Sequence, residues 1–414
     1  MKQMRRNCPG WRQQSLPGRI HDFVGHLVVV PAFTLIACLI ATPTSAQSLD
    51  QVLSFLLTNR SVATDDFPRD QAAAKAASDA ISASLLLNLS TLPISTSAGG
   101  FTYRLDPEIG ASIRTSDSFD PFYTDRALTA SAGQITFGLD YQQASFRNID
   151  GHALADGTLV STASKLHGDA QPFDVETLTL QLRTDSVTLV SNLGVTDRLD
   201  FRAALPLVRL TLSGQRVDTY RGNRAIQATA SGTTSGPGDA IVYAKYNVLR
   251  QHASGLAVGL EARLPTGDDH NLLGTGRTTV TPRFIASIER QRATFHGNVG
   301  YGFDNLSHEL TYNGAATFAS SNHLTLIGEL VGRRLDSLGR LTYTVTPNPT
   351  LTDVDTIRLT STSEQSARLV AVAGLKWNFR STWLLTANVV RPMTDAGLNA
   401  PWTPTLTFEY SFAR

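Results

Sequence analysis

Residues 239–291 show the clearest alternation of apolar and polar positions in the chain. Between 256 and 264 every even position is leucine, valine or alanine, whereas Glu261 and Arg263 stand among the odd positions. Side chains two positions apart share a face of a β-strand, so one face is wholly apolar and the other is charged. The segment 280–289 repeats the pattern, with Arg283 and Glu289 on its polar face. The pattern predicts antiparallel strands that separate an apolar environment from a polar one.

Connections of two lengths join these strands, and their order predicts the architecture. A short turn at 250–254 precedes the strand at 255–265, and a Gly- and Asp-rich loop follows it. Short turns that alternate with long loops are typical of outer-membrane barrels. We therefore expect an all-β protein, a transmembrane antiparallel β-barrel of about 12 strands (with 14 as the alternative) and a short helical N-terminal extension. The expected strands are 133–147, 174–195, 198–213, 239–250, 255–265, 277–290, 293–304, 308–319, 323–335, 367–380, 382–392 and 403–413.

Two parts of this pattern are ambiguous. The alternation slips near Asp185 within 174–195, which predicts a bulge or a hidden turn. The connection 336–366 has room for another hairpin, which is the origin of the fourteen-strand alternative. A secreted sandwich or propeller would also alternate, but strands of this length and this loop parity favour a barrel. The other long connections are expected at 148–173, 214–238, 266–276, 305–307 (compressed) and 393–402.

The first part of the chain follows a different pattern. Residues 1–46 contain a basic region, an apolar core and a small-residue cleavage site that ends at Ala46, which is typical of a secretory signal. Processing as a lipoprotein at Cys38 is the alternative. Residues 47–132 are expected to form an N-terminal extension with helices at 50–59 and 70–89. This N-terminal extension either lies in the periplasm before the barrel or plugs the barrel. Residues 133–414 are the predicted barrel.

Composition and charge narrow the class further. After residue 46 no apolar run reaches 18 residues, which excludes membrane-spanning helices. Residues 1–46 hold five of the 36 basic and one of the 35 acidic residues, so the rest has 31 and 34 and a net charge of −3. This balance gives no reason to expect a nucleic-acid partner. Cys8 and Cys38 also lie in residues 1–46, so we expect no disulfide, thiolate metal site or cysteine nucleophile beyond them.

The last strand points to the expected partners and location. In 403–413 aromatic and aliphatic residues occupy alternate positions up to Phe412, as in the terminal strands by which outer-membrane barrels are recognised. Trp377, Phe379 and Trp383 cluster at one end of the preceding hairpin, as an interfacial aromatic girdle would. We expect the protein in the cell outer membrane, in contact with lipid and, during assembly, with the barrel-assembly machinery.

If the apolar faces meet lipid, the charged faces define the lumen. This interpretation allows either a charged constriction that selects solutes or a lumen braced shut by paired charges. The predicted lumen-lining residues are Arg202, Lys245, Glu261, Arg263, Arg283, Glu329, Arg333, Arg368, Lys376 and Glu409.

Candidate catalytic and metal-binding chemistry is sparse. No GxSxG or HExxH motif follows residue 46, and Gly274 and Gly276 lie in a hairpin loop, so neither an enzyme nor a cofactor is expected. Asp268, Asp269 and His270 form a small loop cluster, for which a solvated loop is the simpler interpretation than a divalent cation site. Surface adhesion through the long loops and hydrolase activity are the alternatives to a channel.

Three segments resemble a family of outer-membrane proteins described as transporters of the phenol-degradation meta-pathway type. They are Leu193–Leu210, Ser235–Leu249 and Leu260–Phe284, with Asp197-Arg198 at a tight turn and the sequences GPGD and PTGD at strand ends. The resemblance covers roughly residues 180–414. It implies an outer-membrane barrel for the passive uptake or export of small, hydrophobic or aromatic solutes, and it carries over no catalytic residue.

Overall fold

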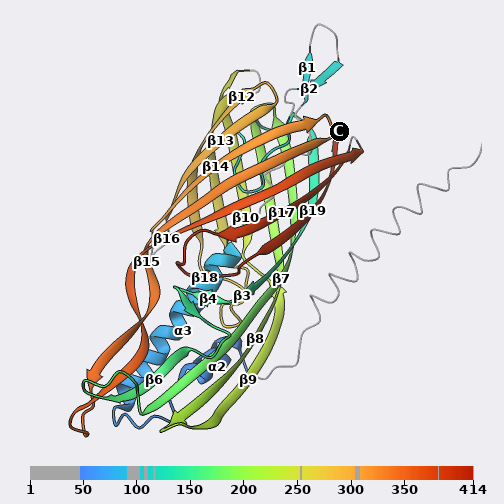
Figure 1. The fold of residues 1–414 in the computed structure, drawn as a ribbon. Coiled ribbons are helices and arrows are strands. Elements are labelled where there is room, and N and C mark those ends of the chain that lie inside the picture. The colour runs from blue at the N-terminus through green and yellow to red at the C-terminus, as the bar shows by residue number, and fades with distance from the viewer. Residues whose placement is uncertain are drawn as a thin grey trace, which may run out of the picture.

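A computed structural model describes residues 47–90, 103–106, 111–114, 118–251, 254–303, 308–380 and 382–413. Its main feature is an antiparallel barrel that continues at one end into a half-open sheet (Figure 1). The predicted signal at 1–46, the compressed loop at 305–307 and most of 99–115 lie outside the described residues. Two small sheets complete the fold: the hairpin β1–β2 (Tyr103–Asp106, Ala111–Arg114), and β4 (Asn148–Ile149), β5 (His152–Ala153) and β18 (Leu398–Asn399).

The barrel closes with twelve strands, which confirms the predicted fold. The first strand pairs with the last in a register that runs from Gln134↔Ala413 to Gln142↔Thr405. The twelve strands are β3 (Gln134–Phe146), β7 (Asp174–Thr196), β8 (Leu199–Tyr220), β10 (Ala240–Gln251), β11 (Ser254–Leu264), β12 (Thr279–Arg290), β13 (Ala293–Phe303), β14 (His308–Ser321), β15 (Leu324–Pro347), β16 (Val354–Arg380), β17 (Trp383–Pro392) and β19 (Thr403–Ala413).

Several strands continue far beyond the barrel and form a sheet that we call the extension, which is distinct from the predicted N-terminal extension at 47–132. In it β8 pairs with β9 (Asn223–Pro237), β7 pairs with β6 (Leu159–Leu166), and β6 pairs with β16. The expectation of a loop at 214–238 is therefore wrong, because this region is a long paired hairpin. The hairpin for which 336–366 had room is present, but it consists of the continuations of β15 and β16 and adds no further strand to the ring. These strands are rich in Thr, Ser and Gly, and they lack the outward apolar face by which the barrel strands are recognised. The fourteen-strand alternative is wrong for the closed ring, since β6 and β9 belong to the extension alone.

Strand β7 reverses its polarity where the barrel meets the extension. Even-numbered side chains point inward along its whole length, and they change from leucine at 178, 180 and 182 to mainly polar residues from Thr184 to Asn192. The outward face changes in the opposite sense, from polar residues in the extension to apolar residues such as Leu193 in the barrel. The pairing with β3 runs without a shift through residue 185. The bulge predicted near Asp185 is therefore wrong: the slip in the pattern is the border between a water-facing sheet and a lipid-facing one.

Two helices fill the concave side of the extension, as the blue ribbons in Figure 1 show. They are α2 (Leu49–Leu57) and α3 (Phe67–Ser90), which confirms the two predicted helical segments. The apolar residues of α2 recur at three- and four-residue spacing, so one face packs against β8 and β9. A Cβ atom at Gly214 of β8 would lie 2.6 Å from the Leu56 Cδ1 atom and 2.9 Å from the Thr179 carbonyl oxygen, a backbone atom, so glycine suits this close approach. Burial of these leucines against the apolar inner face stabilises the extension.

The outer wall of the barrel carries an apolar belt. Exposed leucine, valine, isoleucine and phenylalanine side chains cover β10 to β14, and aromatic rings gather beside the C-terminus. The Trp383 ring lies 4.5 Å from that of Tyr410 and 4.8 Å from that of Phe408, between centroids. Such a belt with an aromatic edge is typical of barrels that span a lipid bilayer. No helix in the described part of the chain is long and apolar enough to cross a membrane.

Candidate functional site: the barrel lumen

All ten predicted lumen residues project from the inward faces of barrel strands. They come from seven strands, and most of their side chains are buried. Arg202 lies on β8, Lys245 on β10, Glu261 and Arg263 on β11, Arg283 on β12, Glu329 and Arg333 on β15, Arg368 and Lys376 on β16, and Glu409 on β19. Burial of this many charges inside a barrel requires partners, and these come from other wall residues and from residues 118–132 at the end of the predicted N-terminal extension.

Residues 118–132, which we call the luminal loop, fill the lumen near the short-turn end of the barrel. From residue 118 to residue 130 every residue except Tyr123 is buried. The loop ends beside the β7–β8 turn, where the Thr129 hydroxyl donates to the Asp197 carbonyl at 2.7 Å. This segment has neither the alternation of a strand nor the period of a helix, so its position in the lumen could not be predicted from the sequence pattern. The lumen is consequently packed by the chain itself.

Glu329 holds the middle of the luminal loop. The backbone N–H groups of Phe122, Tyr123 and Thr124 all donate to its carboxylate, the last two at 3.0 Å. The Thr124 hydroxyl donates to it as well, also at 3.0 Å. Hydrogen bonds to a charged acceptor are about twice as strong as neutral ones, so this one side chain fixes three consecutive peptides.

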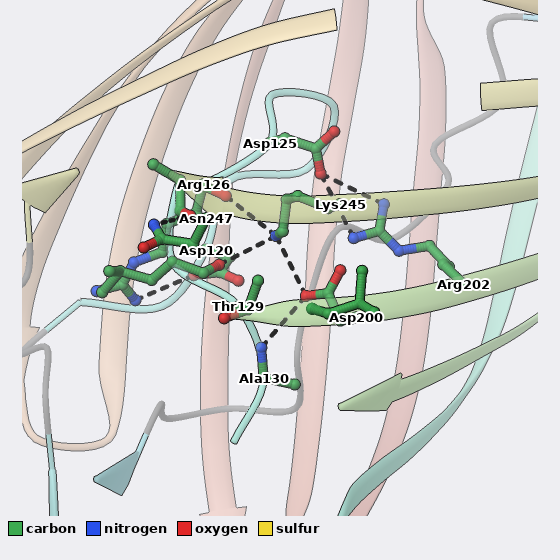
Figure 2. Close-up of polar contacts among 12 residues, drawn as sticks. Asp120, Asp125, Arg126, Thr129, Ala130, Asp200, Arg202, Lys245 and Asn247 are labelled. Atoms are coloured by element: carbon green, nitrogen blue, oxygen red, sulfur yellow. Dashed lines mark hydrogen bonds and ion pairs between the residues drawn. The ribbon is translucent and has the colours of Figure 1, made fainter. Parts of the chain in front are cut away.

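Strands β8 and β10 hold the second half of the loop, as Figure 2 shows. The Lys245 Nζ atom donates to the carbonyls of Arg126 and Leu128, at 3.1 and 3.0 Å. The Asn247 amide donates to the Ala127 carbonyl at 2.8 Å. Lys245 also lies 3.5 Å from the Asp200 carboxylate, which in turn accepts from the backbone N–H of Ala130. Loop carbonyls and loop amides thus both find charged partners on the wall.

Two buried ion pairs join the loop to the wall. Asp125 of the loop lies 3.3 Å from Arg202 of β8 (Figure 2), and neither side chain is accessible to water beyond 3%. Arg126 pairs with Asp120 within the loop at 3.1 Å, and its second nitrogen lies 3.7 Å from Glu289 of β12. Removal of one partner from such a pair leaves an uncompensated charge in the interior, which is strongly destabilising.

Gly194 of β7 lets the end of the loop press against the wall. Its carbonyl accepts from the Gly133 backbone N–H at 2.8 Å. A Cβ atom at position 194 would lie 2.1 Å from the Ser131 carbonyl oxygen, a backbone atom that cannot turn aside. The close contact seals the loop against β7 at the short-turn end.

A cavity of about 620 Å³ lies on the other side of the lumen, toward the extension. One side is formed by α3 and the other by β11 to β15. Glu261 lies 2.7 Å from Arg283 and 3.8 Å from Arg263, and Arg333 is paired with Glu309. The lining includes Asp79, Leu86, Leu87, Glu261, Arg263, Arg277, Arg283, Glu309, Arg333, Leu335 and Leu338. The cavity thus combines a charged wall with an apolar one.

Other predicted lumen residues do not line this cavity. Lys376 and Glu409 pair with each other at 4.0 Å on β16 and β19, and the Lys376 ammonium lies 5.8 Å from the Phe122 ring centre. Lys245 pairs with Asp200. Arg368 stands directly across the β15–β16 ladder from Arg333.

The histidines described in the lumen and in the loop 266–276 make contacts within the fold. His296 projects into the lumen, where its Nδ1 atom lies 2.9 Å from the Ser287 Oγ atom, which also accepts from the Ala127 N–H. His270 lies 3.6 Å from Asp50 of α2, and Asp268 accepts from Asn271. Within the described ranges no group of three or more His, Cys, Asp or Glu side chains is placed to hold a metal ion.

The family described as "Putative MetA-pathway of phenol degradation" matches residues 151–401, which is more than half of the chain. The chain belongs to this family. The match begins at the extension hairpins and ends before the last strand, so it includes ten of the twelve barrel strands, from β7 to β17, and leaves out the luminal loop. The resemblance seen in the turn and strand-end motifs is therefore confirmed.

Solved structures with a similar fold are outer-membrane barrels. A channel from Pseudomonas putida F1 has 16% identity, covers 69% of this chain and 98% of its own, and gives a TM-score of 0.43. The translocator domain of the autotransporter NalP from Neisseria meningitidis has 12% identity, with coverage of 68% and 89% and a TM-score of 0.36. The monoaromatic hydrocarbon channel CymD has 8% identity, with coverage of 69% and 89% and a TM-score of 0.26. No protein with a curated description matches the sequence. The barrel assignment rests on the strand pairing itself.

Proposed function

We propose that the protein is an outer-membrane barrel for the passive movement of small solutes, and that the luminal loop is the barrier to that movement. The export signal expected at 1–46, the outward apolar belt and the aromatic last strand support insertion into the outer membrane. The short turns would then face the periplasm and the extension would face outward. The luminal loop would close the periplasmic half of the path.

The observation that carries this proposal is the cavity of about 620 Å³ that ends at the luminal loop. Its volume is in the range of small-molecule sites, and its lining offers both apolar surface and convergent charges. A solute that reaches the cavity from the extension side has the loop between it and the short-turn end. Net passage would require the loop to move, because residues 118–130 occupy the space that a solute would cross.

Small hydrophobic or aromatic compounds are the proposed solutes. The family description refers to phenol degradation, and the apolar wall formed by Leu86, Leu87, Leu335 and Leu338 suits such compounds. A surface-binding barrel is the second candidate, because the extension presents β9 as a sheet edge along 223–237.

A reversible disulfide tests the barrier directly. The hydroxyl oxygens of Ser118 in the loop and Thr317 in the wall lie 2.9 Å apart, which suits the double variant Ser118→Cys/Thr317→Cys. Both native cysteines lie within residues 1–46, so the pair would be the only thiols in the described chain. We expect oxidation to abolish solute flux into proteoliposomes and reduction to restore it.

A matched pair on the wall controls for the cross-link itself. Thr136 of β3 and Ser411 of β19 have hydroxyl oxygens 3.1 Å apart at the closing seam, away from the luminal loop. Thr136→Cys/Ser411→Cys should leave flux unchanged in either redox state. Equal flux through the oxidised and reduced loop variant would show that the loop is not the barrier, and absence of flux in every form would favour the surface-binding candidate.

A further inference from the structure

Two carboxylates meet on the inner face of the extension without a counter-charge. Asp174 of β7 and Asp218 of β8 lie within hydrogen-bonding reach of each other, and each has a buried Oδ1 atom without a hydrogen-bond partner. Within the described part of the chain neither carboxylate forms an ion pair. Burial raises the pKa of Asp174 to about 6, and the neighbouring Asp218 carboxylate adds to this rise. Two like charges held this close need a cation or a shared proton.

The charged residues packed around this pair do not supply that cation. Glu176 is the third acid on this face, and its carboxylate lies 3.3 Å from the Arg216 guanidinium. Arg216 also donates to two carbonyls at the end of α2, so it is held away from the pair. Arg60 donates its backbone N–H to Glu176, but its own guanidinium belongs to an exposed side chain that lies over the Phe55 ring. Two negative charges on this inner face therefore lack a cation.

Two buried hydroxyl groups continue the row of oxygen atoms. Ser164 of β6 stands directly across the ladder from Asp174, and Thr356 of β16 stands directly across from Ser164. Directly opposed residues point to the same face, with Cβ atoms about 5 Å apart. Ser164 is 2% exposed and Thr356 is 0% exposed, and neither hydroxyl has a hydrogen-bond partner. Four neighbouring strands thus direct unpartnered oxygen atoms to the same side of the sheet.

Such a row offers the ligands that a hard divalent cation prefers. Calcium takes oxygen ligands at about 2.3–2.6 Å in flexible geometry, binds carboxylates through one or both oxygens, and completes its shell with water. Softer metals prefer thiolate or imidazole ligands, whereas this row consists of carboxylate and hydroxyl oxygens. An ion with two positive charges would offset the two acids.

We propose that Asp174, Asp218 and Ser164 bind a divalent cation of the calcium type, with Thr356 reached through a water molecule on the ion. The site has two carboxylates, so it is not one of the groups of three or more His, Cys, Asp or Glu that the described ranges lack. The ion joins β6, β7 and β8 where β7 begins, at the end of the extension remote from the barrel. It stabilises the sheet against which α2 packs, and it does not depend on solute movement.

The test is calcium titration of the full mature chain in phosphatidylcholine nanodiscs, after EDTA treatment and dialysis and with empty nanodiscs as the blank. We expect one saturable site in calorimetry, and slower trypsin cleavage of the β8–β9 hairpin when calcium is bound. Asp174→Asn should weaken calcium binding about tenfold or more, because affinity depends on the number of charged ligands. Asp355→Asn is the matched control, since Asp355 precedes Thr356 on the opposite face and lies 3.2 Å from His167. It should leave the affinity unchanged.

Three results would overturn the inference. Saturable binding of neither calcium nor magnesium to the folded wild-type protein would mean that the two acids share a proton instead. Unchanged calcium affinity in Asp174→Asn would remove this residue from the site, and an equal loss in Asp355→Asn would reduce the binding to general surface charge. Asparagine removes the repulsion between the acids, so Asp174→Asn should fold at least as well as the wild type without calcium. The heat-dependent gel mobility of each variant reports whether its barrel has folded.

Discussion

Two lumen residues on neighbouring strands, Glu329 and Arg368, show two different environments for a charge inside the barrel. Glu329 accepts from three consecutive peptide N–H groups, so its charge is fully used in holding the luminal loop. Arg368 faces another arginine and has no partner in the described chain. Both were predicted to point inward from strand parity alone. Parity cannot predict the partner, because the partner of Glu329 comes from a segment 205 to 207 residues away.

Replacement of Arg126 and of Arg368 by methionine compares an arginine that has an ion-pair partner with one that has none. Arg126→Met should destabilise the protein by about 3–5 kcal/mol, because it leaves the buried Asp120 without its ion pair. Arg368→Met should be neutral or stabilising, since no described hydrogen bond or ion pair is lost. Urea unfolding of the two variants in the same lipid vesicles measures both. A large loss of stability in Arg368→Met would show that the guanidinium holds the fold.

At the scale of single elements, the outward face of strand β8 changes from apolar to polar where the barrel meets the extension. Leu205 lies in the apolar belt, and Gln215, ten positions later on the same face, lies in the extension. The sequence predicted the barrel part of β7 and β8 well, because an outward apolar face gives a strong period-two signal. It also predicted β7 over its whole length, at 174–195, but it ended the next strand at 213 and so missed the continuation of β8 and its partner β9. On both faces of the extension the alternating signal weakens or reverses.

A charge scan along this one face tests the position of the boundary. Leu205→Lys should destabilise the inserted barrel by about 2–4 kcal/mol, because lysine near the bilayer midplane is costly on the lipid face. Gln215→Lys should change stability by less than about 0.5 kcal/mol, as is usual for a water-exposed site. Unfolding in vesicles of defined thickness gives both values. Similar costs at the two positions would place the extension within the membrane.

At the scale of the whole molecule, the closed ring of twelve strands was predictable and its contents were not. Strand parity, turn length and the aromatic last strand all recur locally, so each contributes to the prediction of the barrel. The luminal loop has no local period, and it is ordered only by contacts to strands that are distant in sequence. The two helices were predictable as helices, but their position inside the extension depends on the reversed polarity of β7 and β8.

Removal of residues 47–98 tests whether the helices or the luminal loop block the interior of the barrel. We expect the shortened chain to stay closed in single-channel recordings, because the luminal loop and its ties to Glu329, Lys245 and Asp200 remain. The β8–β9 hairpin should become sensitive to trypsin, because its apolar inner face loses α2. A large, steady conductance in this variant would instead place the barrier at the helices.

The closing seam between β3 and β19 has a consequence for the order of assembly. It joins the first barrel strand to the last, and the ring it completes encloses both the end of α3 and the luminal loop. Once all twelve strands are paired, a segment cannot enter the interior except by threading through an end or breaking the wall. The N-terminal segments must therefore be seated while the sheet is still an open curl. The last of the twelve strands in chain order, β19, is then also the one that commits the whole protein to its final state.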